Sequence, residues 1–401
     1  MPNLYTTFDH TVSQKRIRTL YGGVYAMLAK EFGAKLLSPD FFKHVQARNF
    51  EDSLDPVAEL ADADFVFHSG MDLQMQVFDQ GVLPLNLFAD QEDFDMDEYS
   101  FRRSGTSDIE QRTNRYLFAH IPDKTHCLYV PQDFKCTDIT DKMSAVQLFD
   151  VLKVPSPHSL PLSTVLKSSP YRFAKHRRGS KSLQVHYFDE DTNPFGEFGI
   201  DNRDWLVQAE VPCPTNFPSF LRVNFDFGAI TAVAIEYDPT FGKVPDLANV
   251  DILPLTLHGF DTNHKLTDLE KHILNSYGIS EEKREIPEEV MRYANSVMGW
   301  CNGIGIQCAG IDFLKDKETG DWNCVDVNRS PGAMIYYVLE RTRDVNPLFR
   351  QPYRRDEDFT PLRRAAIHQY VREPFAKLIG ADYPNLYPYS RLRGGFLSPI
   401  F

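Results

Sequence analysis

The stretch AGIDFLKDKETGDWNCVDVNRSPG, residues 309–332, contains two short apolar runs separated by a polar segment. The runs Ile311–Leu314 and Asn323–Val327 have the length of β-strands. The polar segment between them includes Gly320, and glycine is favoured where a chain reverses in a tight turn. The stretch therefore predicts a β-hairpin, and the rest of the chain can be interpreted around it.

Three oxygen-bearing side chains are predicted to share one face of this hairpin. Asp326 and Asn328 are two residues apart on one strand, and folding back about the turn brings Asp312 opposite Asp326. Two carboxylates and a carboxamide on apolar strands repel and desolvate one another unless a cation lies between them. Because the set holds only oxygen ligands, it favours Mg²⁺, with Mn²⁺ possible. The alternative is a solvated hairpin face with acidic residues and no ligand.

A second polar feature, upstream of the hairpin, is basic. Lys175 ends the apolar run Tyr171–Lys175, and the loop RRGSKS follows at 177–182. Successive N–H groups of a glycine-containing loop can bind phosphate oxygens, and flanking cations add charge-assisted hydrogen bonds. A solvated basic loop is the alternative. Neither a Walker pattern nor a GxGxxG pattern occurs, so neither a Walker loop nor a dinucleotide fold is indicated.

Helical and strand-like patterns alternate along the chain, which predicts an α/β or α+β fold with an α/β unit over roughly the first 135 residues. Apolar spacing predicts helices over 17–32, from a cap at Asp138 or Thr140 to Leu152, over 287–301 and over 361–379. Strands are predicted at 64–68, 82–88, 171–175, 183–188, 205–211, 220–227 and 230–237.

Length and composition limit the classes of function. A chain of 401 residues predicts two or three packed units. Its net charge of −13 argues against general affinity for nucleic acid or an anionic membrane surface, and no apolar run is long enough to span a bilayer. Six cysteines without a Cys-x-x-Cys pair favour reduced thiols, and with them a cytoplasmic location, over disulfides or a zinc site.

The order of these features resembles the ATP-grasp enzymes over residues 138–340. The matching pieces are Asp141-Lys142 opening a helix that ends in VPSP, the strand with Lys175 and its loop, the strands WLVQAEV and FLRVNFDFGAITAVA, and the hairpin ending in VDVNRSPG. The ribosomal-protein glutamyl ligases are the most similar, and glutathione synthetase and D-alanine–D-alanine ligase are more distant.

The resemblance implies an ATP-grasp fold in which two α+β subdomains clasp the nucleotide, preceded by an α/β domain. It places an N-terminal domain at 1–137, the small subdomain at 138–207 and the large subdomain with the metal site at 208–345. Residues 346–401 form a partly helical C-terminal extension.

The resemblance also implies roles for individual residues. Nucleotide phosphates would be bound by Lys142, Lys175, Gly179, Ser180 and Lys181. The adenine would lie at a hinge formed by Gln208, Glu210 and Val211. The catalytic residues would be Arg222, which neutralises the transferring phosphoryl group, and Arg329, which with Ser330 grips the acceptor. Magnesium would be held by Asp312, Asp326 and Asn328.

The implied reaction is carboxylate–amine ligation with ATP through an acyl phosphate, with release of ADP and phosphate. Its partners would be a small-molecule or peptide carboxylate and an amine, and a homodimer is the commonest assembly. Phe220 and Asp326 depart from the family, which often has an acid and a glutamate at these positions. The Asp-x-Asn spacing at 326–328 also resembles inositol polyphosphate kinases, so a small-molecule kinase is the main alternative, followed by a nucleotide-binding module without chemistry.

Overall fold

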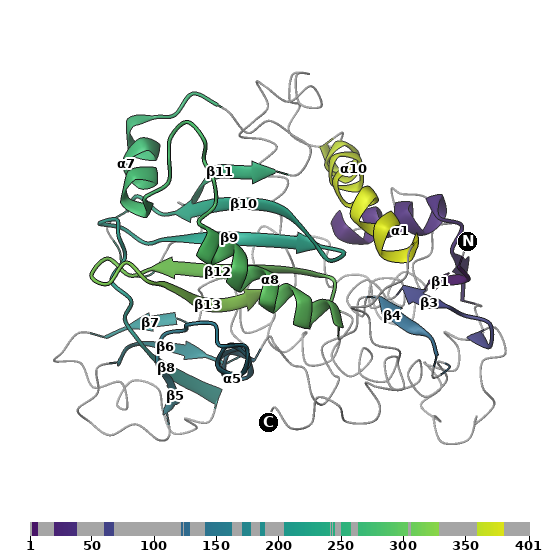
Figure 1. Ribbon diagram of the computed structural model, residues 1–401, viewed down its shortest axis with the longest axis horizontal. Coiled ribbons are helices and arrows are strands. Elements are labelled where there is room, and N and C mark those ends of the chain that lie inside the picture. The colour runs from purple at the N-terminus through teal and green to yellow at the C-terminus, as the bar shows by residue number, and fades with distance from the viewer. Residues whose placement is uncertain are drawn as a thin grey trace, which may run out of the picture. The chain divides into compact units, whose positions relative to one another are not determined.

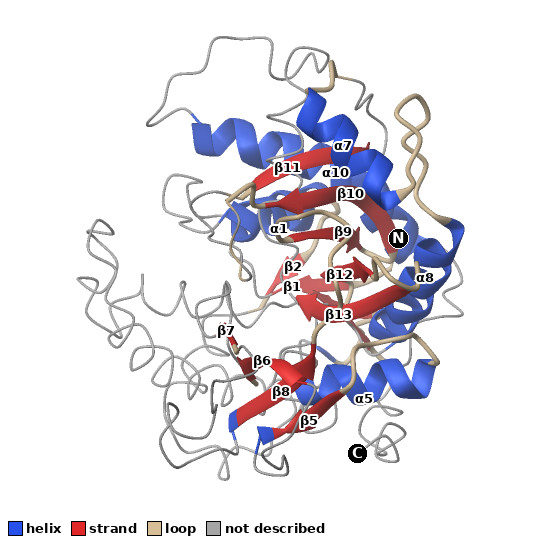
Figure 2. Cartoon of the chain, turned by 90° about the vertical axis from the view of Figure 1, so that its left-hand side faces the viewer, coloured by secondary structure: helices blue, strands red, loops and turns tan. Residues whose placement is uncertain are grey.

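The computed structural model describes residues 2–6, 20–37, 60–67, 122, 124–128, 141–162, 171–177, 185–188, 204–240, 242, 244, 250–257, 264–303, 306–328 and 359–380. Helices and both parallel and antiparallel sheets occur among them (Figure 2), which confirms the predicted α+β class. The strand predicted at 82–88 lies outside the described residues.

The chain divides into two compact units. The first unit comprises residues 1–137, 302–307 and 354–397, and the second comprises 138–301, 308–353 and 398–401. None of the helices described is long and apolar enough to cross a membrane.

The first unit contains a parallel sheet of four short strands in the order β2-β1-β3-β4. Their bounds are β1 Leu4–Thr6, β2 Lys35–Leu36, β3 Phe65–Phe67 and β4 His126–Leu128. Parallel pairing agrees with the α/β character predicted for this part of the chain, because parallel strands need crossover connections. The crossover between β1 and β2 includes helix α1 (Leu20–Glu31).

Helix α10 (Phe359–Gly380) packs on α1, as Figure 1 shows. Arg372 Nε donates to Glu31 Oε1 at 2.5 Å, and Phe375 packs on the ring of Phe67. Gly23 permits this contact, because a Cβ there would lie 2.3 Å from Nε of the buried Arg364. Close packing of Arg364 against α1 therefore explains the glycine at position 23.

The small sheet of the second unit is antiparallel, in the order β5-β8-β6-β7. Its strands are β5 Ser159–Pro161, β6 Tyr171–His176, β7 Val185–Tyr187 and β8 Trp205–Ala209, with a core of Leu162, Ala174, Phe188 and Val207. Helix α5 (Lys142–Leu152) precedes them. The cap predicted at Asp138 or Thr140 was wrong: Asp141 caps α5 by accepting a hydrogen bond from the Met143 amide at 3.0 Å.

The large sheet of the second unit has the order β11-β10-β9-β12-β13 and is antiparallel. Its strands are β9 Ser219–Asp226, β10 Ala229–Tyr237, β11 Asp251–Leu257, β12 Cys308–Lys315 and β13 Trp322–Asn328. The turn between β9 and β10 has positive φ at Phe227 and Gly228, as a two-residue hairpin with a type I′ turn requires. The predicted hairpin of β12 and β13 is confirmed, with Asp312 opposite Asp326.

Helices α7 (Asp268–Tyr277) and α8 (Glu288–Gly303) cover one face of this sheet (Figure 1). Tyr277 stacks on Trp322 with ring centroids 5.6 Å apart, and Lys315 Nζ donates to the Tyr277 carbonyl at 2.9 Å. Because side chains alternate along a strand, apolar residues such as Ile311 and Phe313 fill this face. The polar residues of the central strands, such as Asp312, point to the opposite face of the sheet.

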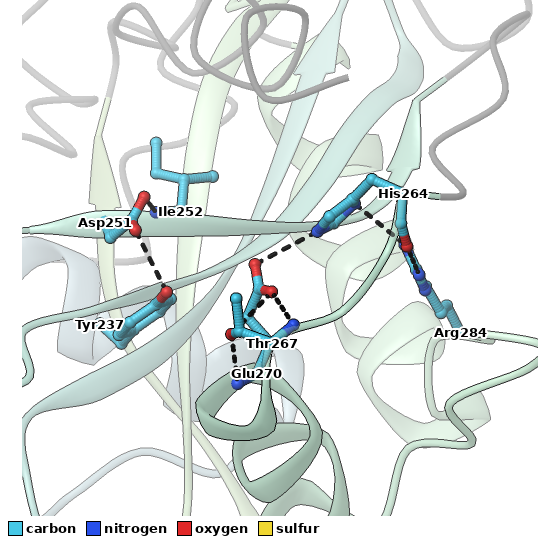
Figure 3. A network of polar contacts seen from close by, with 7 residues as sticks. All are labelled: Tyr237, Asp251, Ile252, His264, Thr267, Glu270 and Arg284. Carbon is cyan, nitrogen blue, oxygen red and sulfur yellow. Dashed lines mark hydrogen bonds and ion pairs between the residues drawn. The ribbon is translucent and has the colours of Figure 1, made fainter. Parts of the chain in front are cut away.

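Helix α7 begins at a polar network that the sequence interpretation missed (Figure 3). Thr267 and Glu270 form a capping box: Glu270 N donates to Thr267 Oγ1 at 3.2 Å, and Thr267 N donates to Glu270 Oε2 at 2.7 Å. His264 lies between the Glu270 carboxylate and the Arg284 guanidinium. Arginine has only hydrogen-bond donors, so Nδ1 of His264 accepts a hydrogen bond from Arg284. The ring proton is therefore on Nε2, which donates a hydrogen bond to Glu270.

Candidate functional site

A row of charged side chains crosses the large sheet on the face opposite to α8. From β10 to β13 the row consists of Glu236, Arg222, Asp312 and Asp326. Arg222 donates twice to Asp312, from Nε to Oδ1 at 2.6 Å and from Nη2 to Oδ2 at 2.8 Å. Its Nη1 donates to Glu236 Oε1 at 2.7 Å. Glu236 and Asp312 are only 8% and 6% exposed, so these are buried ionic contacts.

A β-bulge gives Asp326 its place in the row. Phe313 pairs with Cys324 and Asp312 pairs with Asp326, so Val325 is an extra residue in β13. In a regular ladder Val325 would oppose Asp312, and Asp326 would point to the apolar face that α8 covers. The bulge therefore brings the two carboxylates to the same side of the hairpin.

An amide and a glycine complete this part of the site. Asn328 Nδ2 donates to Asp312 Oδ2 at 2.9 Å. Gly310, which pairs with both Asn224 and Asn328, leaves the space beside them open. A Cβ at Gly310 would lie 2.9 Å from Asn224 Oδ1 and 3.4 Å from Arg222 Cδ. A larger residue there would therefore push the polar side chains apart.

Two lysines, one on α5 and one on the small sheet, lie close to Asp326 in this row of charged side chains. Lys142 is the first residue of α5, and its Nζ lies 3.4 Å from Asp326 Oδ2. Lys175 Nζ donates to Gln208 Oε1 at 2.6 Å, and Gln208 Nε2 donates in turn to Ser159 Oγ at 3.0 Å. The pKa of Lys175 is lowered to about 8, chiefly by burial and also by Lys142, while Asp326 and Asp312 oppose the shift.

The first turn of α5 is held to the end of β6. Lys142 N donates to the Arg177 carbonyl at 3.0 Å, and the Arg177 side chain binds both oxygens of Asp141, with Nε 2.9 Å from Oδ1. These contacts position Lys142 by its backbone. They also anchor Arg177, the first residue of the predicted basic loop.

Signs alternate along this cluster except at one point. Glu236, Arg222 and Asp312 alternate, and Asp326 is followed by Lys142, but Asp312 and Asp326 are neighbours of like charge. Burial raises the pKa of Asp312 and Asp326 raises it further, while Arg222 and Lys175 act in the opposite direction. Burial alone would lower the pKa of Arg222, but Asp312 and Glu236 outweigh it and raise that pKa, so Arg222 stays charged.

The structure brings most of the residues predicted for the site into one cluster. That cluster holds Lys142, Lys175, Gln208, Arg222, Asp312, Asp326 and Asn328. Glu210 lies just beyond β8, where Tyr187 Oη donates to its Oε2 at 3.2 Å, and Val211 follows it. The residues outside the described part are Gly179, Ser180, Lys181, Arg329 and Ser330, and their roles stay predictions.

Three contributions to the cluster were missed from the sequence. They are Glu236, which shares Arg222 with Asp312, Ser159, which orients Gln208, and the Arg177–Asp141 pair. Glu236 left a signal: it is the one acidic residue in the apolar strand Ala229–Tyr237. A buried charge needs a partner, so such a residue indicates an ion pair across the sheet.

Comparison with known proteins finds no matching family model and no matching curated protein. Several solved structures are similar. The ATP-grasp ligase PsnB, solved with a minimal precursor, is 12% identical and covers 92% of this chain and 99% of its own, with a TM-score of 0.42. The macrocyclase MdnB from Microcystis aeruginosa MRC is 14% identical and covers 92% and 98%, with a TM-score of 0.37.

A D-alanine–D-alanine ligase from Bacillus anthracis, solved with ATP, is 10% identical and covers 86% of this chain and 97% of its own, with a TM-score of 0.37. These structures include members of the superfamily that residues 138–340 resemble.

Proposed function

We propose that this chain is an ATP-grasp carboxylate–amine ligase, which uses Mg-ATP to convert a carboxylate into an acyl phosphate and then joins it to an amine. The observation that carries the proposal is the charged row itself. Two carboxylates lie side by side at the one point where its signs do not alternate, and cations from three elements surround them: Arg222 on β9, Lys142 on α5 and Lys175 on β6.

The residues present fit a divalent cation. Asp312, Asp326 and the Asn328 amide are all oxygen donors on one face of a hairpin. No group of three His, Cys, Asp or Glu side chains that could hold a metal occurs within the described ranges. Two carboxylates with an amide are nevertheless a suitable set, because Mg²⁺ at nucleotide sites takes one or two carboxylates and completes its shell with phosphates and water. When bound there, Mg²⁺ or Mn²⁺ would neutralise charge on the phosphates.

The chain's own residues account for the remaining charge. Lys142 and Lys175 would bind phosphate oxygens, with Gln208 orienting Lys175 through the bond that it already makes. Arg222 would bind the transferring phosphoryl group, since its guanidinium is kept charged by two carboxylates. Phosphoryl transfer needs mainly positioning and neutralisation of oxygens, so the site requires no cysteine or serine nucleophile.

The acyl-phosphate step distinguishes a ligase from the small-molecule kinase. A carboxylate oxygen attacks the γ-phosphorus of ATP and ADP leaves; the amine then attacks the acyl carbon and phosphate leaves, with loss of one proton from nitrogen. ADP and free phosphate therefore form in equal amounts. A kinase would produce ADP while the phosphate stays on its acceptor.

The test measures ADP and phosphate together, with Mg-ATP and pools of carboxylates, amino acids and peptides. We expect equal release that depends on both a carboxylate and an amine. ADP without phosphate would contradict the ligase and support a kinase. The variant Asp326→Ala with Asn328→Ala should abolish turnover with the fold retained, whereas Asp321→Asn, at an exposed position of the same hairpin, should leave turnover unchanged.

A further inference from the structure

Arg222 is shared between two carboxylates that differ in their relation to the metal ligands. Asp312, a proposed ligand, accepts from Nε and Nη2. Glu236 accepts from Nη1 at 2.7 Å and lies on the far side of Arg222 from Asp326. Among the described residues, Arg222 is the ion-pair partner of Glu236. Glu236 can therefore affect the metal ligands through its contact with Arg222.

We propose that Glu236 is a positioning residue, the carboxylate that holds the Arg222 guanidinium in place when Asp312 turns toward a divalent cation. The inference rests on the proposed function and deepens it. In the structure both oxygens of Asp312 are engaged, by Arg222 and by Asn328. Asp312 would have to turn partly away from Arg222 to hold a cation together with Asp326, and a buried guanidinium left without a carboxylate partner would be strongly destabilised. The bond to Glu236 does not depend on the metal.

The residues around Arg222 allow its guanidinium to contact Glu236 and restrict other positions of that group. Ala234 lies directly opposite Arg222 in the register, and its small side chain lets the guanidinium reach diagonally to Glu236 two residues further on. The ring of Phe220, opposite Glu236, lies 5.1 Å from Arg222 Cζ and covers the guanidinium. Glu236, Ala234 and Phe220 together therefore define one position for the end of Arg222.

The experiment compares Glu236→Gln with wild type in the affinity for Mn²⁺-ADP, with calorimetry as the readout and no turnover needed. Glutamine keeps the shape and one acceptor oxygen but removes the charge. We expect affinity to fall about tenfold to a hundredfold, the range for loss of a charged hydrogen-bond partner. Glu282→Gln, at an exposed position, is the matched control and should bind as wild type does.

A double-mutant cycle separates positioning from a general structural role. In an Arg222→Gln background, Glu236→Gln should change Mn²⁺-ADP affinity by less than about twofold, because there is no guanidinium left to hold. Equal loss in both backgrounds, or wild-type affinity in Glu236→Gln, would overturn the inference while the proposed function stands. If the wild-type chain binds no Mn²⁺-ADP, the proposed function fails and the inference fails with it.

Discussion

At the scale of single residues, the burial of the Lys175 ammonium group lowers the stability of the folded protein. Its pKa of about 8, lowered chiefly by burial, means that its ammonium group is held in an unfavourable environment. The shift from the ordinary value of 10.5 corresponds to about 3 kcal/mol against folding at neutral pH. Two nearby carboxylates limit this cost, and a phosphate would remove it.

Lys175→Met should therefore stabilise the free protein at pH 7 and weaken nucleotide binding. The unfolded chain takes up a proton on Lys175 below pH 10.5 and the folded chain only below about 8, so wild-type stability rises with pH across that window. The advantage of the variant in urea unfolding should shrink as pH increases from about 8 to 10.5. The Lys283→Met variant, at an exposed position, should show no such trend. A constant advantage over that window would contradict the assignment.

At the scale of elements, the bulge in β13 decides which side chains reach the site. Deleting Val325 would let β12 and β13 pair as a regular ladder, because the register on both sides of the bulge would then be continuous. Cys324 and Asp326 would then be consecutive and point to opposite faces, so Asp326 would stay opposite Asp312 on the polar face.

We expect the Val325 deletion to retain Mn²⁺-ADP binding, because Asp326 stays beside Asp312 on the polar face of the hairpin. Val325→Ala keeps the extra residue and should retain binding. Calorimetry with both variants tests this, and circular dichroism shows whether the sheet is kept. Loss of binding in the deletion variant, with the sheet kept, would show that the site needs the bulge itself and not only a carboxylate opposite Asp312.

The start of α7 gives a prediction on acid stability. Burial would raise the pKa of Glu270, but hydrogen bonds from His264 and Thr267 outweigh it and lower that pKa to about 2. A lowered carboxylate pKa contributes stability that is present above the unfolded value of about 4.5 and is lost as pH falls toward 2. Glu270→Gln should be less stable than wild type at pH 7, and this difference should decrease below pH 4.5. Glu282→Gln serves as the exposed control in the same urea titrations.

At the scale of the whole molecule, the chain forms two compact units, and the C-terminal helix α10 belongs to the first of them. The side chain of Phe375 is fully buried and contacts Phe32 and Phe67, whose rings lie 5.2 and 5.1 Å away. Nothing in the sequence of 359–380 indicated that this helix packs on α1, because the partners are more than 300 residues apart.

Phe375→Ala should destabilise the first unit by about 3–5 kcal/mol, the usual cost of removing a buried phenylalanine. Hydrogen exchange should speed up in α1 and α10 and change less in β9 and β12 of the second unit. Phe313→Ala, at a fully buried position of β12, should show the reverse pattern. Uniform acceleration in both variants would mean that the two units unfold together.

The sequence by itself determined the features that depend on neighbours along the chain. The hairpin of β12 and β13 and helix α5 follow from turn residues, alternation and apolar spacing. Only the tertiary structure decided which distant residues meet. Glu236 joins Arg222, Lys142 and Lys175 approach Asp326, and the bulge at Val325 sets which way Asp326 points. These contacts depend on strand order and on the balance between burial and charge, which no local pattern contains.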